Sequence, residues 1–140
     1  MYRTATAVAI TAALGLSLAP TAGAATKNGI TPVAPKAGKS VPAGKSPKFK
    51  MRVKGTGQVW VHVCSSAKKD RDGVICTTAS IGQAKKSGSQ FVYTPKFFDF
   101  PEFWLNTPGT YHWQAHRIAC EGGDTSDCKQ EGPVVKFKVK

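Results

Sequence analysis

The sequence predicts an all-β fold, and three observations carry this prediction. Apolar and polar residues alternate with a period of two along most of the chain after residue 47. Turn-forming glycine, proline, asparagine and serine recur at short intervals between these runs. No long window carries an apolar stripe with the helical period, so a parallel sheet with crossover helices is excluded. The number and spacing of the predicted strands favour a sandwich of two sheets.

The first 24 residues have the organisation of a signal peptide. Arg3 gives a positive start, residues 7–19 are apolar, and the small residues Ala22, Gly23 and Ala24 suit signal peptidase. The apolar run is shorter than the roughly 20 residues that span a membrane. We therefore expect a mature chain that is secreted or associated with the cell envelope and has no transmembrane segment. Cleavage of the signal peptide is left open.

Residues 25–45 predict an extended lead-in rich in proline, glycine and lysine, and residues 46–140 predict one domain. Ile30–Val33 is a weak candidate for a first strand, and Pro32 restricts it to an edge of the sheet.

The net charge of +12 is concentrated at one end of the chain. Residues 25–54 hold eight basic residues and no acid, whereas residues 55–140 hold eleven basic residues and eight acids. The excess is almost all lysine, which favours nonspecific attraction to anions over sequence-specific nucleic-acid binding. The residues expected to supply this attraction are Lys36, Lys39, Lys45, Lys48, Lys50, Arg52 and Lys54.

The strands after the lead-in are predicted at residues 47–55, 58–64, 74–81, 91–95, 110–120 and 133–140, with a turn at 85–90. In the first of these, Phe49, Met51 and Val53 alternate with basic residues, which predicts one buried and one wet face. The last strand alternates valine and phenylalanine with lysine in the same way, and lysines there discourage aggregation between sheet edges.

An aromatic segment at residues 97–104 has two interpretations. Its rings close an edge of the core, or they form an exposed patch that binds a partner. The rings are Phe97, Phe98, Phe100, Phe103 and Trp104.

The stretch "LNTPGTYHW", with Leu105, Pro108-Gly109-Thr110 and Tyr111, resembles the E–F corner of fibronectin type III and related immunoglobulin-like domains. The resemblance implies a seven-stranded immunoglobulin-like sandwich in which Leu105 plugs the core and Tyr111 makes a tyrosine corner. The final "GPVVKFKVK" looks like the last strand of that family. The early tryptophan typical of fibronectin type III is absent, because Phe49 or Met51 stands where it is expected.

A second resemblance concerns two segments bounded by cysteines. The stretches "CSSAKKDRDGVIC" and "CEGGDTSDC" are similar in layout to the disulfide loops of secreted chromoproteins of the neocarzinostatin kind. That likeness implies, as an alternative function, a carrier of a small molecule in an apolar cleft. Those proteins are acidic and lack the tyrosine-corner pattern, so the immunoglobulin-like resemblance is preferred.

Four cysteines in a short exported chain predict two disulfides, because no spacing between them is typical of zinc. In the sandwich that the resemblance implies, Cys64 and Cys120 lie at opposite ends of antiparallel strands. They are then too far apart to bond. The expected pairs are Cys64–Cys76 and Cys120–Cys128.

One face of two adjacent strands is a candidate binding surface. If Val59, Val61 and Val63 face the core, the side chains between them face outward. In the strand that contains Trp113, an inward tryptophan likewise places the side chains on either side of it outward. The surface would comprise Trp60, His62, His112, Gln114 and His116. His112 and His116 would lie about 13 Å apart along one strand, so no metal site is predicted. An ordinary solvated face is the other interpretation.

No enzyme is predicted, because neither G-x-S-x-G nor H-E-x-x-H occurs and the carboxylates are few. Asp99 and Glu102 are the two acids that could in principle act as a pair, although such acids are more often simply solvated. No cofactor is expected. The predicted function is a non-catalytic binding or structural module that contacts cell-envelope polymer or an extracellular protein. A further alternative is a protease inhibitor that presents Lys68, Lys69 and Arg71 on a loop.

Overall fold

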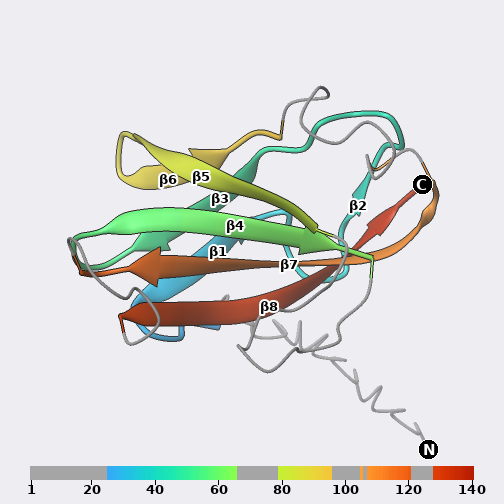
Figure 1. The fold of residues 1–140 in the computed structure, drawn as a ribbon. Helices are drawn as coiled ribbons and strands as arrows, with labels where there is room; N and C mark the ends of the chain where they lie inside the picture. The colour runs from blue at the N-terminus through green and yellow to red at the C-terminus, as the bar shows by residue number, and fades with distance from the viewer. Residues whose placement is uncertain (1–24, 66–78, 96–104, 106, 121–127) are drawn as a thin grey trace, which may run out of the picture.

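The chain forms β-strands and no helix in the part that the computed structural model describes, residues 25–65, 79–95, 105, 107–120 and 128–140. The strands, shown in Figure 1, are β1 (Ile30–Ala34), β2 (Ser40–Val41), β3 (Phe49–Val53), β4 (Gln58–Cys64), β5 (Ala79–Ser87), β6 (Gln90–Tyr93), β7 (Gly109–Ile118) and β8 (Lys129–Val139). The predicted all-β class is confirmed. Among these residues, no helix is long and apolar enough to cross a membrane.

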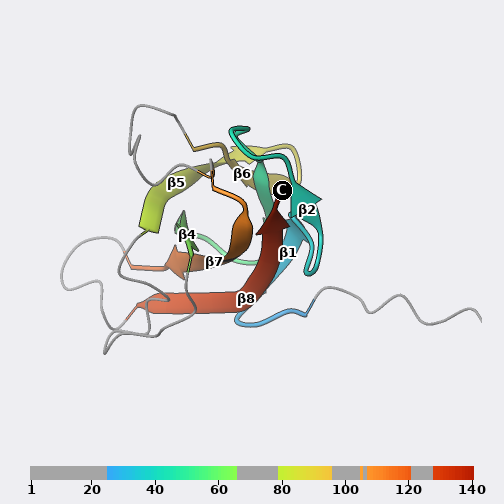
Figure 2. The ribbon, with the colours of Figure 1, turned by 90° about the vertical axis from the view of Figure 1, so that its right-hand side faces the viewer.

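The strands join in one sheet with the order β1-β3-β6-β5-β4-β7-β8-β2. Neighbouring strands are antiparallel, except that β2 runs parallel to β8. Figure 2 looks along the strands and shows the sheet curled around an interior, with β4, β7 and β8 below and β3, β5 and β6 above. Because of this curl, β1 at one end of the order contacts β8 near the other end.

The interior is filled by aromatic rings from strands that are distant in the sequence. Phe49 lies at its centre, with its ring centroid 5.5 Å from that of Trp113, 5.9 Å from Phe137 and 6.2 Å from Tyr93. Such edge-on and stacked ring pairs add to the stabilisation from burial alone. The indole Nε1 of Trp113 donates a 3.1 Å hydrogen bond to the Pro35 carbonyl, so the buried polar atom is satisfied.

Strands β3 and β8 have the one-sided burial that their alternation predicts. Phe49 and Met51 of β3 are fully buried, while Arg52 on the opposite face is exposed. In β8 Val135, Phe137 and Val139 are buried, whereas Lys136 and Lys138 are exposed, as is Lys140 directly after the strand. Val134, which precedes this alternating run, is also exposed. Period-two patterning therefore gives both strand type and exposure correctly here.

The described part of the chain has eight strands, whereas the resemblance implied seven. Strand β1 stands at an edge of the strand order, which accommodates Pro32. Strand β2 lies in the expected lead-in and has only two residues, too few for a period-two pattern to be seen in the sequence. It forms because its backbone pairs with β8, a partner that local sequence does not reveal.

The predicted turn at residues 85–90 is shorter in the structure. Strand β5 continues to Ser87 because Lys85, Lys86 and Ser87 pair with β6. Gly88 begins a two-residue connection with a φ of 60°, which glycine adopts without strain. The earlier part of the predicted strand, residues 74–78, lies outside the described residues.

The segment before β7 has the geometry of a tyrosine corner. The Tyr111 hydroxyl donates a 2.9 Å hydrogen bond to the carbonyl of Thr107, four residues upstream. Leu105 is 3% exposed and belongs to the core. The Tyr111 ring packs on Phe137 with centroids 5.9 Å apart. These contacts fix the entry of the chain into β7.

A disulfide joins Cys120 to Cys128, with Cα atoms 5.7 Å apart, as the pairing predicted. It links the end of β7 to the beginning of β8. Cys64, at the end of β4, is also disulfide-bonded. Its expected partner Cys76 lies outside the described residues, so the pair Cys64–Cys76 stays a prediction.

Candidate functional site

The five residues of the predicted binding surface do lie on one face, formed by β4 and β7. The register pairs Trp60 with His116 and His62 with Gln114, and His112 pairs with Cys64. We call the set Trp60, His62, His112, Gln114 and His116 the histidine face. The alternation of inward valines and outward side chains in β4 therefore predicted correctly that these side chains share one face.

The histidine face differs from the expected surface in its exposure. His62 and His116 are each 7% exposed and Gln114 is 5% exposed, so the expectation of a flat solvated surface is wrong for these three. Trp60 and His112 are half-buried. β4 and β7 lie in the middle of the strand order, so each of these side chains has neighbours from flanking strands on both sides.

The burial keeps the imidazole of His116 neutral. The pKa of His116 is lowered to about 3, mainly by desolvation and in addition by the nearby His62 and Lys129. The pKa of His112 is also lowered, by burial and then by Lys136. At neutral pH these two histidines therefore carry no charge that would attract an anion.

The rings of His62 and His116 make an edge-on contact with centroids 4.5 Å apart. Two imidazoles supply too few ligands for a strong zinc site. Within the described ranges, no group of three or more His, Cys, Asp or Glu side chains gathers in a way that could hold a metal ion.

Gln114 has a structural partner on β8. The pairing of β7 with β8 shifts between Gln114 and His116, so that β8 has one extra residue around Gly132. The amide Nε2 of Gln114 donates a buried 2.7 Å hydrogen bond to the Gly132 carbonyl. Because a bulge takes backbone groups out of the ladder, this side chain replaces a ladder hydrogen bond.

A second site forms where the lead-in pairs with β8. The amide of Lys138 donates to the Lys39 carbonyl at 2.9 Å, and the amide of Lys140 donates to the Val41 carbonyl at 3.1 Å. The amide of Gly38 donates to the Lys136 carbonyl at 2.9 Å. We call the exposed side chains at this junction the basic edge. They are Lys39, Lys136, Lys138 and Lys140.

No described acidic side chain lies at the basic edge. Glu131 is the one acid among the described residues, and it stands near the other end of β8, opposite His116. There it forms an ion pair with Lys129, with 3.7 Å between Nζ and Oε1. The four ammonium groups of the basic edge therefore add their fields without an acidic side chain between them among the described residues.

The predicted basic residues are distributed over more than one surface. Six are exposed and Lys50 is half-buried. Lys39 lies in the basic edge, whereas Lys50 and Arg52 lie in β3 and Lys54 directly follows it. Strand β3 is remote from β8 in the strand order. Prediction from sequence missed Lys136, Lys138 and Lys140 as partners of the lead-in. Their alternation was visible, but the parallel pairing with β2 was not.

Other side chains that support the sheet lie at the opposite end of β7. Arg117 donates a 2.8 Å hydrogen bond from Nη1 to the Thr56 carbonyl and another from Nη2 to Gln130 Oε1. These contacts tie the β3–β4 connection to β8.

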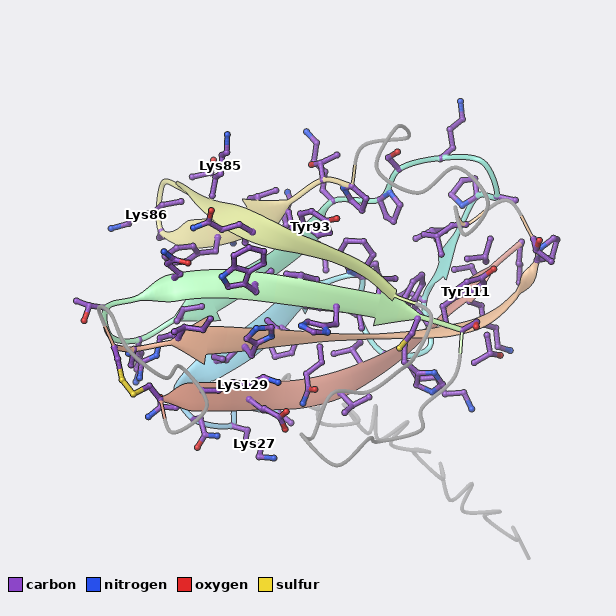
Figure 3. All side chains as sticks on the ribbon, viewed as in Figure 1. Lys27, Lys85, Lys86, Tyr93, Tyr111 and Lys129 are labelled. Atoms are coloured by element: carbon purple, nitrogen blue, oxygen red, sulfur yellow. A yellow bond between two sulfur atoms is a disulfide. The ribbon has the colours of Figure 1, made fainter. Side chains whose placement is uncertain are left out.

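Lys85 and Lys86, labelled in Figure 3, project from the β5–β6 hairpin away from the sheet. They provide exposed lysines far from β2 in the strand order.

Several sequence candidates fall outside the described residues. They are Cys76, the loop residues Lys68, Lys69 and Arg71, the carboxylates Asp99 and Glu102, and the aromatic segment 97–104. Both interpretations of that aromatic segment stay open.

Comparison with known proteins finds no family model, no curated protein and no solved structure that matches this chain.

Proposed function

We propose that this protein is an exported, non-catalytic module that binds an anionic polymer of the cell envelope or an acidic extracellular protein. The observation that carries the proposal is the basic edge, where four exposed lysines from two distant parts of the chain are held on one paired backbone. Lysine ammonium groups attract anions without demanding a particular geometry. The Cys120–Cys128 disulfide supports export, since such bonds persist in oxidising compartments.

The proposal includes an immunoglobulin-like sandwich as the scaffold. Strands β1, β3 and β6 are neighbours in the order, and β5, β4, β7 and β8 follow as a second group. In this scheme β2 is a strand that has crossed from the first group to pair with β8. The hydrogen bond from Tyr111 to Thr107 and the burial of Leu105 support the assignment.

The basic edge is a better candidate for contact than the histidine face. His62, Gln114 and His116 are almost inaccessible, and the pKa of His116 keeps that ring uncharged. The basic edge is accessible and presents four lysine ammonium groups. We therefore assign recognition to charge rather than to aromatic or imidazole contacts, and with it we expect no sequence-specific binding of nucleic acid.

The test is a binding titration of the mature chain against polyphosphate, which serves as a defined polyanion. The double variant Lys136→Gln/Lys138→Gln should weaken binding about fivefold, because each exposed ionic contact contributes up to about 1 kcal/mol. The matched control Lys85→Gln/Lys86→Gln removes the same charge from the remote hairpin and should change affinity much less. Raising the salt concentration should weaken the wild-type complex.

Equal losses in the two double variants would show that net charge, rather than the basic edge, determines binding. Affinity that ignores salt would contradict an electrostatic mode altogether.

A further inference from the structure

A groove of about 500 Å³ lies between the β1–β2 connection and the segment that enters β3. Its apolar lining comes from Val33, Ala34, Pro35, Val41 and Pro47. Lys36, Lys39 and Lys48 stand around it, together with Ser40. This volume is within the range of about 300–1,000 Å³ that small-molecule sites occupy. A mostly apolar lining with a few polar groups is also typical of such sites.

The walls of the groove are fixed by contacts with the core. The carbonyl of Pro35 accepts the hydrogen bond from the buried Trp113 indole. Val41 packs against the core, and its carbonyl accepts from the Lys140 amide. The Lys39 amide also donates a 3.1 Å hydrogen bond to the Lys36 carbonyl, which closes the turn between the two strands. A groove held in this way loses little entropy when a ligand binds.

The chemistry of the lining specifies two parts of a ligand. The three lysines present only donors and positive charge, and no described carboxylate lines the groove, so the polar part of the ligand is an anion. The five apolar residues have neither donors nor positive charge with which to bind that anion. They favour a ligand with an apolar body, because burial of apolar surface is favourable in proportion to its area.

A peptide strand is a poor occupant of this groove. Addition of a strand needs a row of free backbone donors and acceptors along a sheet edge. Pro32 lies within β1, and Pro42 directly follows the two residues of β2. Since proline has no amide hydrogen, both edges are blunted against a further strand.

We propose that this groove is a binding site for a small anionic amphiphile, an acyl or alkyl chain that ends in a phosphate or carboxylate. The chain lies on the apolar lining, and the anion pairs with Lys36, Lys39 or Lys48. This site goes beyond the attraction of a polyanion to the basic edge, with which it shares Lys39.

The experiment uses hexyl, octyl and decyl phosphate below their micellar concentrations, with binding followed by calorimetry on the mature chain. Each added methylene should tighten binding about threefold to fourfold until the groove is filled, which corresponds to about 0.8 kcal/mol. Affinity that does not change with chain length would overturn the proposal, because only the charge would then be recognised. Equal binding of octyl phosphate and uncharged octyl glucoside would overturn it as well.

Paired variants separate this site from the basic edge. Lys36→Gln/Lys48→Gln neutralises two exposed groove lysines and should weaken octyl phosphate about fivefold. Lys136→Gln/Lys138→Gln should leave octyl phosphate nearly unchanged while it weakens polyphosphate. If neither variant affects octyl phosphate, the groove assignment is wrong. If polyphosphate binding fails while the dependence on chain length persists, the proposed function is wrong and the groove stands.

Discussion

The histidine face and the outer side of β8 have the same alternating geometry and opposite environments. Both consist of side chains that point away from the aromatic core. On β8 these side chains are lysines and are exposed, whereas His62, Gln114 and His116 are buried. Alternation along a strand therefore identifies the face of the sheet to which a side chain belongs. The degree of exposure depends in addition on the position of the strand in the sheet and on the size of its neighbours.

The largest test of this contrast places a lysine on the histidine face. His116→Lys should reduce the free energy of unfolding by about 3 kcal/mol or more, because a cation would be buried next to Lys129, and Glu131 opposite it already forms an ion pair with Lys129. Urea denaturation measures the change. The matched reverse exchange, Lys138→His, should alter stability by less than about 0.5 kcal/mol. Similar effects in the two variants would remove the distinction between the two faces.

A smaller effect is expected from pH. The pKa of His116 is about 3 in the folded chain and about 6.5 when unfolded, so as the pH falls the unfolded state binds the proton first. Stability should therefore fall below pH 6.5, by about 1 to 2 kcal/mol between pH 7 and pH 5. Denaturation curves at both pH values measure this loss. In His116→Gln the fall in stability between pH 7 and pH 5 should be smaller. If it is unchanged, groups other than His116 cause the pH dependence.

The hydrogen bond of Gln114 is expected to matter by a similar or slightly smaller amount. Gln114→Ala leaves the Gly132 carbonyl without this donor in a buried bulge and should cost about 1 to 2 kcal/mol. Gln83 of β5 is exposed, so Gln83→Ala serves as the control and should cost less than about 0.5 kcal/mol. Equal costs for the two glutamines would indicate that the bulge does not depend on the side chain.

The smallest change in stability is expected on β8. Lys136→Gln/Lys138→Gln should alter the free energy of unfolding by less than about 0.5 kcal/mol, because both side chains are exposed and have no described acidic neighbour. Thermal or urea denaturation gives this value on the protein used for the polyphosphate titration. A large loss of stability would mean that the lysines pack as well as carry charge.

Prediction from the sequence succeeded where information is local. The core residues of β3 and β8 follow from strict alternation, and Leu105 and Tyr111 follow from a short motif with a defined hydrogen bond. The Cys120–Cys128 bond joins positions close in the sequence.

The failures concern relations between distant segments. Strand β2 exists only through its backbone pairing with β8, and the burial of His62 and His116 depends on which strands flank β4 and β7. Prediction of the basic edge requires both a local sequence pattern and the pairing of distant segments. Its lysines were visible in the sequence as two separate runs, but only the parallel pairing brings their backbones together at one end of β8.

The pairing of β2 with β8 also has a consequence for the time course of folding. Ser40 meets Lys138 and Val41 meets Val139, so closure of this part of the sheet joins segments separated by most of the domain. Contacts of such high sequence separation slow folding, and all-β domains dominated by them fold in milliseconds to seconds. The hairpin of β5 and β6, which joins neighbouring residues, is free to form on the microsecond scale. The basic edge and the groove beside it are therefore expected to be late products of folding, assembled only after β8 has reached the lead-in.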